Sequence, residues 1–184
     1  MPGTGDTKGL LLAELLRSTE NPDGGMSVSL WDNLEDMLGF ERDPSRQDLA
    51  RGLEEFYPPL AYPRGDYWVK HLEIISPAPL EEFRQGYLRL VGGRLRLGGW
   101  QEYERYHQKS VGSTTGGTKG LRQRQLLRGT DDPDEAVSLS VWDTLGDMRS
   151  YETGEVRQSM AKQVEHLYTG QYWVKHFQMG VPGP

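Results

Sequence analysis

The spacing of apolar residues changes along this chain from every second position to a helical period, and the change occurs twice. Between Met26 and Trp31, apolar and small polar residues alternate, which predicts a strand with two different faces. The apolar run from Leu10 to Arg17 precedes it, and a turn rich in Asn, Pro, Asp and Gly separates the two runs. Together the two runs predict an antiparallel hairpin.

After the hairpin, the apolar residues Leu34, Met37 and Phe40 recur at helical spacing. Asp32, and Asp143 later in the chain, stand just before such helical runs, where an N-cap residue is expected. In both parts of the chain the helical pattern breaks and resumes, and a short strand closes the segment. The breaks fall at residues 43–44 and 153–154, and the closing strands at residues 67–75 and 172–179.

The chain contains two copies of one sequence, which explains why the pattern occurs twice. From Thr7 to Tyr57, 23 of 51 positions are identical to their counterparts from Thr118 onward, without a gap. A shared composition does not produce so many matches in register, so the two copies are an internal repeat. The clearest matches are Thr7–Leu10 with Thr118–Leu121, Ser27–Asp32 with Ser138–Asp143, and Tyr67–His71 with Tyr172–His176.

The second copy has two further elements in front of it that the first copy lacks. Tyr87 to Leu97 predicts a strand, with a bulge at Gly92 and Gly93. Trp100, Tyr103 and His107 then share one face of a helix. The second copy thus has the ferredoxin-like order strand–helix–strand–strand–helix–strand. We predict an α+β protein with a partial repeat at 7–75, a linker at 76–85 and a complete repeat at 86–180.

Composition narrows the classes of function. The 184 residues carry a net charge of −6, which argues against nucleic acid as a partner. The basic cluster from Arg122 to Arg128 is short, and we expect a solvated strand face there, not a phosphate site. The absence of cysteine excludes disulfides, thiolate metal sites and cysteine nucleophiles. No apolar run or leader predicts a membrane span or secretion, so a cytoplasmic protein is expected.

The order of motifs in the second copy resembles the antibiotic biosynthesis monooxygenase domains of the dimeric α/β-barrel superfamily. The residues that carry the resemblance are Gly98–Glu104, Gly120–Leu121, Leu126–Arg128, Asp132–Glu135, Ser138–Asp143 and Asp147–Met148. The resemblance covers residues 86–180 fully and residues 7–75 in part. It implies two ferredoxin-like units packed into a barrel, as a homodimer or within one chain that carries both repeats.

The first repeat departs from this family pattern because it lacks the first strand and helix. In such a fold the first strand is central, so its absence would leave backbone groups unpaired. Two explanations are open: the chain begins at an internal methionine of a longer protein, or a partner chain fills the gap. We favour the first, because Met1 to Asp6 is similar in composition to the loop from Ser113 to Gly117.

Trp31 and Trp142 match the strand-end tryptophan of the family, which the resemblance implies is a wall for a flat aromatic ligand. The competing interpretation is core packing. Ser140 lies beside Trp142 on the same strand face, and a small polar residue next to a large aromatic one favours a pocket. Arg128 and Arg17 end matching strands and either orient an oxyanion or pair with aspartates of the adjacent turn; we favour the pairing.

The histidines offer the candidate catalytic groups. His71 and His176 recur in the motif Tyr-Trp-Val-Lys-His, and imidazole suits a base at neutral pH; a structural role at the strand edge is the alternative. His107 lies on the aromatic face of its helix, and a half-buried structural histidine is its alternative. Haem ligation by His107 or His166 is a weaker hypothesis, because neither copy has the arrangement of haem-degrading relatives. The catalytic candidates are His176, His107 and Tyr172, and the substrate-binding candidates are Trp142, Trp31, Ser140, Arg128, Tyr67 and His71.

The sequence therefore predicts a cofactor-independent monooxygenase that acts on an aromatic or phenolic small molecule. In such chemistry the deprotonated substrate itself reduces oxygen, and the protein binds it, deprotonates it and excludes water. No metal-binding or nucleotide-binding motif is present, so no cofactor is expected. The alternative is a non-catalytic ligand-binding or assembly module of the same fold, because fold alone does not imply function.

Overall fold

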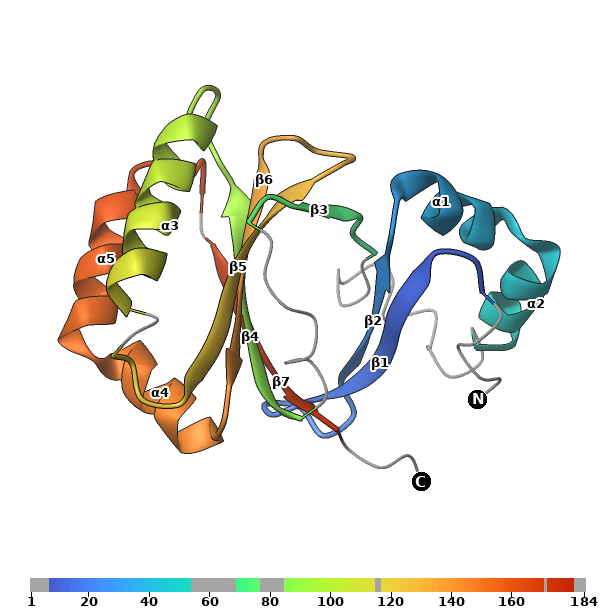
Figure 1. Ribbon diagram of the computed structural model, residues 1–184, viewed down its shortest axis with the longest axis horizontal. Coiled ribbons are helices and arrows are strands. Elements are labelled where there is room, and N and C mark those ends of the chain that lie inside the picture. Colours follow the sequence, from blue (N-terminus) through green and yellow to red (C-terminus); the bar gives the residue numbers. More distant parts are fainter. Residues whose placement is uncertain (1–6, 54–68, 77–84, 115–116, 171, 181–184) are drawn as a thin grey trace. The chain divides into compact units, whose positions relative to one another are not determined.

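The computed structural model describes residues 7–53, 69–76, 85–114, 117–170 and 172–180. The chain divides into two compact units (Figure 1). The hairpin–helix unit comprises Met1–Leu15 and Ser27–Val69, and the sheet unit comprises Leu16–Met26 and Lys70–Pro184. Tyr67 and most of the linker predicted at 76–85 lie outside the described residues.

The sheet unit holds an antiparallel sheet in the order β7-β4-β6-β5-β3. The second repeat contributes β4 to β7, and their order along the chain and across the sheet is that of a ferredoxin-like fold, so the predicted α+β class is confirmed. The bounds are β3 Leu72–Ile74, β4 Gly86–Arg94, α3 Trp100–Thr114, β5 Leu121–Gly129, β6 Glu135–Trp142, α4 Leu145–Thr153, α5 Glu155–Glu165 and β7 Trp173–Met179.

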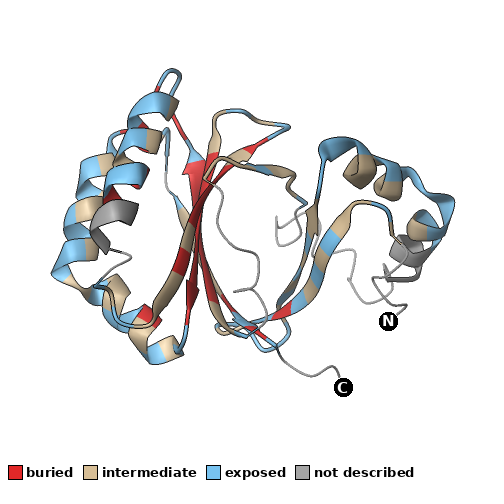
Figure 2. Cartoon of the chain, in the orientation of Figure 1, coloured by how far each residue is buried: buried red, intermediate tan, exposed pale blue. Residues whose placement is uncertain are grey.

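Helices α3, α4 and α5 cover one face of the sheet (Figure 1). Most of the buried residues lie on the central strands, as Figure 2 shows, and the outer sides of the helices are exposed. On β6 every residue from Ala136 to Trp142 is buried, although serines alternate with apolar residues along the strand. Burying a large aliphatic side chain stabilises a fold by about 1.5–3 kcal/mol, so these strands contribute much of the core.

The hairpin–helix unit holds α1 Leu34–Arg42, α2 Pro44–Leu53 and most of the hairpin formed by β1 Leu10–Ser18 and β2 Gly25–Trp31. The predicted N-caps were wrong by one residue. Asn33 caps α1 and Thr144 caps α4 with their side chains, because Asp32 and Asp143 still donate backbone hydrogen bonds to the carbonyls of Gly9 and Gly120. The preceding aspartates therefore belong to the hairpins.

The two repeats form the same local contacts at corresponding positions. The indole N–H of Trp31 donates to Ser29 Oγ, and that of Trp142 donates to Ser140 Oγ, both at 2.9 Å. Each of these tryptophans packs on an aromatic ring of the helix that follows, Phe40 or Tyr151, at 5.1 and 5.0 Å. The likeness of the two repeats is thus a likeness of structure as well as of sequence.

Two hydrogen bonds at strand ends in the sheet unit join equivalent residues of the two repeats. The backbone N–H of Thr19 donates to the carbonyl of His176 at 3.1 Å, and that of Thr130 donates to the carbonyl of His71 at 2.9 Å. Thr19 and Thr130 are counterparts in the repeat, as are the two histidines. A strand of one repeat therefore meets a strand of the other in the same way at both places.

The bulge predicted at Gly92 and Gly93 is absent. The register of β4 with β6 runs through both glycines without a shift. The glycines instead make room for aromatic rings. A Cβ on Gly92 would lie 2.2 Å from the Trp173 indole, and one on Gly93 would lie 2.8 Å from the Tyr168 ring.

We predict that Gly92→Ala destabilises the protein by about 1–3 kcal/mol, the usual cost of forcing atoms into a filled space. The matched control is Gly170→Ala, because a Cβ on Gly170 meets no atom within 4 Å. Urea unfolding followed by tryptophan fluorescence measures both. Equal stability of the two variants would contradict the close packing of Trp173 on β4.

Candidate functional site

The sheet unit contains a cavity of about 430 Å³ between the sheet and the helices α3 and α5. This volume lies within the range of about 300–1,000 Å³ that is typical of small-molecule sites. The sheet contributes residues of β4, β5 and β6, and the segment after α5 contributes two tyrosines. Among the lining residues are Arg89, Tyr103, His107, Arg124, Ser138, Arg157, Tyr168 and Tyr172.

His107 is a titratable group that the cavity isolates from solvent. Only 5% of the residue is exposed, and neither ring nitrogen has a hydrogen-bond partner of good geometry among the described residues. Burial, and then the charge of Arg124, lowers the pKa of His107 to about 3, although the nearby backbone of Gln125 opposes this. The imidazole is therefore neutral at physiological pH, and it can accept or donate a hydrogen bond to a ligand.

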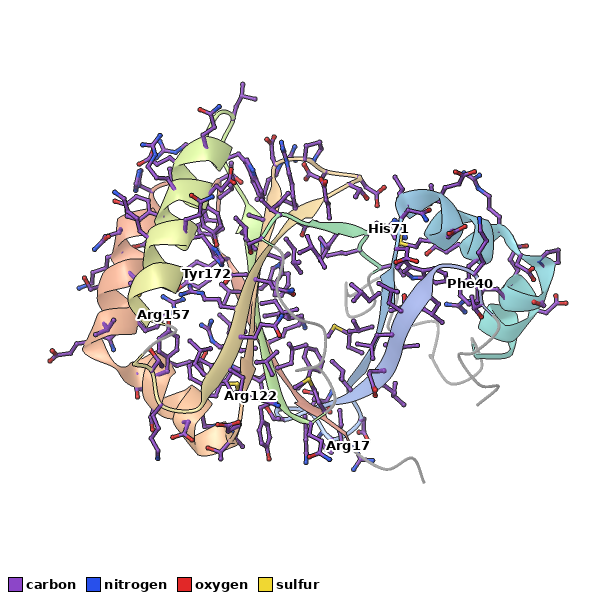
Figure 3. The ribbon with its side chains drawn as sticks, in the orientation of Figure 1. Arg17, Phe40, His71, Arg122, Arg157 and Tyr172 are labelled. Atoms are coloured by element: carbon purple, nitrogen blue, oxygen red, sulfur yellow. The ribbon has the colours of Figure 1, made fainter. Side chains whose placement is uncertain are left out.

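Tyrosines form one wall of the cavity. The hydroxyl of Tyr168 donates to that of Tyr103 at 2.8 Å, and their rings meet edge to face with centroids 5.7 Å apart. The ring of Tyr172 lies 5.6 Å from that of Tyr168 and is on the helix-covered side of the sheet (Figure 3). Burial raises the pKa of both Tyr103 and Tyr168, so these phenols stay neutral. Such a wall suits a flat aromatic ligand.

Arg89 lies at the cavity as part of a buried network of charges. Its Nε donates to Glu152 on α4 at 2.6 Å, and the same carboxylate accepts from His176 Nε2 at 2.9 Å. Burial would raise the pKa of Glu152, but the hydrogen bonds from His176 and Arg89 together lower it to about 2. The Glu152 carboxylate is therefore ionised and holds Arg89 in place.

Comparison with solved structures identifies the fold. A candidate monooxygenase from Fusobacterium nucleatum aligns over 96% of this chain and 78% of its own, with a TM-score of 0.60 at 10% identity. A candidate monooxygenase from Lactobacillus acidophilus aligns over 95% of this chain and 79% of its own, with a TM-score of 0.60 at 10% identity. An anthrone oxidase-like protein aligns over 95% of this chain and 78% of its own, with a TM-score of 0.61 at 14% identity.

The chain shares its fold with these solved structures. The three structures align with nearly all of this chain, so both repeats take part in the likeness. No family model matches the sequence, and no curated protein matches it. Among the described helices, none combines the length and the apolar character that crossing a bilayer requires.

The predicted site residues separate into two groups. His107 and Tyr172 line the cavity together. His176 lies outside the lining, and both of its ring nitrogens contact carboxylates, those of Glu20 and Glu152. These contacts leave His176 no free nitrogen with which to accept a proton from a substrate.

Trp142 and Ser140 lie in the core next to the cavity but not in its lining. Trp142 is fully buried, bonded to Ser140 and packed on Tyr151. Its repeat counterpart Trp31 belongs to the hairpin–helix unit, where it packs on Phe40. The surroundings of Trp142 correspond to core packing, the competing interpretation, whereas Trp31 is partly exposed.

Arg128 and His71 do not line the cavity. Arg128 donates to the carbonyl of Pro133 at 2.9 Å and stacks on Trp100 at 4.7 Å, while Asp134 pairs with Arg94. The favoured pairing of Arg128 with a turn aspartate is therefore replaced by a backbone contact. His71 bonds to Asp131 at 2.9 Å, as His176 bonds to Glu20. Tyr67 lies outside the described residues.

Sequence reasoning missed Arg124, Arg157 and Tyr168. Arg124 belongs to the basic cluster that we expected to be a solvated strand face, but its Nη1 atom is buried and the residue lines the cavity. The alternation along β5 carried the signal, because Arg124 shares its face with Leu126, which is in the core. Arg157 and Tyr168 follow the repeat as counterparts of Arg46 and Tyr57, but nothing in their spacing indicated a cavity.

We predict that His107 and His176, two of the histidines of the sheet unit, titrate far apart. His107 stays neutral down to about pH 4, since its pKa is about 3, whereas the hydrogen bonds to Glu152 and Glu20 raise the pKa of His176 above 6.5. Imidazole ¹⁵N shifts measured by NMR between pH 4 and 9 check this. Coincident titration of the two residues near pH 6.5 would contradict the burial of His107.

The raised pKa of His176 also predicts how stability depends on pH. The folded state binds this proton more tightly than the unfolded state, so its stabilisation is complete below about pH 6.5 and is lost as the pH rises through the folded pKa. His176→Gln should remove this slope and cost about 1–3 kcal/mol at pH 6. Urea unfolding at pH 6 and pH 9 measures both effects, with His166→Gln as the control, because His166 is half exposed.

Proposed function

We propose that the protein is a cofactor-independent monooxygenase that oxidises an aromatic, phenolic or enolisable small molecule bound in the cavity of the sheet unit. The observation that supports this most is the neutral, unpartnered His107 next to Arg124 at a tyrosine wall. A base, a cation and an aromatic surface are the groups that this chemistry requires of a protein. The named fold relatives include an anthrone oxidase-like protein, which supports the same class of chemistry.

In this proposal the ring system of the substrate packs on Tyr103, Tyr168 and Tyr172, and its acidic C–H or O–H faces His107. His107 takes the proton, and Arg124 stabilises the oxyanion of the resulting enolate or phenolate. Arg124 is also the second cause of the low pKa of His107. As the oxyanion neutralises Arg124, the imidazolium becomes easier to form, so proton transfer and charge compensation assist each other.

The substrate anion then supplies the electrons for the reaction with oxygen. It transfers one electron to O₂, and the radical pair combines into a substrate peroxide, which takes the proton back from His107. Loss of water converts a methylene into a carbonyl. One oxygen atom enters the product and the other leaves as water, so all four electrons come from the substrate and no reductant is needed. Enclosure between the sheet and the helices limits the access of water to the anion.

A non-catalytic binding module is the second candidate function. The low pKa of His107 favours it, because an imidazole with a pKa of about 3 is a weak base in the empty cavity. Under this alternative the same cavity binds an aromatic ligand through its tyrosines and arginines. Oxygen consumption separates the two candidates, because only the enzyme accelerates it.

We predict that the protein accelerates oxygen uptake by a substrate from a panel of anthrones and hydroquinones, without added metal or flavin. His107→Ala should lower kcat by about a hundredfold or more, the usual contribution of a general base. The matched control is His166→Ala, since His166 is a half-exposed residue that pairs with Glu102 on the surface. An oxygen electrode measures the rates.

Equal rates in His107→Ala and the wild type, with circular dichroism showing both folded, would overturn the role of His107. Binding of panel compounds without oxygen uptake would support the binding module instead. Calorimetric titration of the same compounds therefore accompanies the rate measurements.

A further inference from the structure

The cavity carries an excess of positive charge. Its lining includes four cationic side chains, Arg89, Lys109, Arg124 and Arg157, and no aspartate or glutamate among the described residues. The chain as a whole has a net charge of −6, so this local excess runs against the composition. A concentration of cations in an acidic protein indicates a site for an anion.

The protein compensates only part of this charge. Glu152 neutralises Arg89 through a hydrogen bond of 2.6 Å. Arg124 and Arg157, by contrast, form no ion pair with any of the described residues. The Nη1 atom of Arg124 is also buried without a hydrogen-bond partner. Burying one nitrogen of a cationic group without a partner is costly, and an anionic ligand that accepts a hydrogen bond from it would remove that cost.

The rest of the lining is aromatic or apolar, which describes the remainder of the ligand. Tyr103, Tyr168 and Tyr172 form the aromatic wall. Val156 and Tyr172 are 63% and 37% exposed although they line the cavity, so its mouth presents apolar surface to solvent. Such a mouth suits the entry of a flat ring system.

We propose that the ligand of this cavity is an aromatic acid, in which a fused ring system carries a carboxylate. The carboxylate pairs with Arg124, and the positive charge of Arg157 attracts it. The planar guanidinium fork matches a carboxylate through two parallel hydrogen bonds, which favours this anion. The inference rests on the proposed function only in taking this cavity as the ligand site. It adds the substrate class, since a neutral phenol leaves both arginines uncompensated when it binds and can compensate Arg124 only after it has lost its proton.

The proposed ion pair also has a consequence for His107. The charge of Arg124 lowers the pKa of this imidazole, so a carboxylate that neutralises Arg124 raises the pKa again. An aromatic acid would thereby strengthen the base that removes its own proton. A neutral aromatic of the same shape would not.

Calorimetric titration with a matched pair of probes tests the inference. The probes are 1-hydroxy-2-naphthoate and its methyl ester, which share the ring and the phenol but differ in charge. We expect the acid to bind about 10- to 100-fold more tightly, the factor that corresponds to a charge-assisted hydrogen bond. Arg124→Gln should abolish this preference and Arg124→Lys should retain part of it. Arg105→Gln, an exposed position on α3 outside the lining, should leave it unchanged.

Three results would overturn the inference. Equal affinity for the acid and the ester, or no binding of either, would show that the cavity does not select aromatic acids. A preference that persists in both Arg124→Gln and Arg157→Gln would place the anion elsewhere. Tighter binding of 1-naphthyl phosphate than of the carboxylate would assign the site to a different anion.

The two proposals fail separately. If the acid binds as expected but oxygen uptake does not depend on His107, the ligand class stands and the oxygenase proposal falls. If His107 supports oxygen uptake from neutral anthrones and the acid has no advantage, only the ligand class falls.

Discussion

The sheet unit depends on β4, which pairs along its length with two neighbours. Eight residue pairs join it to β6 and seven join it to β7, so removing it would leave two rows of backbone groups without partners. Its sequence fits this position. Leu88 and Leu90 are buried on one side, while Arg89 and Val91 line the cavity on the other. One strand thus supplies both the core and the floor of the site.

The electrostatics of the site follow from this arrangement. A charged residue on the helix-covered face of a buried strand must find a partner, and Arg89 finds Glu152, which also binds His176. Arg124 on β5 has no such partner among the described residues. Burial lowers the pKa of His107 most, and the uncompensated charge of Arg124 lowers it further. The network around Arg89 is therefore structural, whereas the pair of Arg124 and His107 is available for chemistry. Burial and the charge of Arg124 lower the pKa of His107, whereas the hydrogen bonds to Glu152 and Glu20 raise the pKa of His176.

The repeat shows how one sequence pattern gives the same local structure with different burial. Trp31 and Trp142 form the same hydrogen bond to a serine and the same aromatic contact. Trp142 is completely buried beneath the sheet unit's helices, whereas Trp31 is partly exposed. Local geometry was therefore set by the motif. The neighbouring helices and strands, in contrast, decided how deeply each tryptophan is buried.

The sequence by itself determined the repeat, the strand and helix order of the second copy, and the family of folds, because these follow from local periodicity and turn chemistry. It also placed His107 and Tyr172 among the candidates. Tertiary structure alone decided that both line one cavity and that His176 contacts two carboxylates. It also decided that the Nη1 atom of Arg124 is buried while the residue has no ion pair among the described residues. Burial and charge pairing depend on residues distant along the chain: Glu152 and His176 meet Arg89 only after the sheet has formed. A local sequence pattern does not predict such a contact between distant residues.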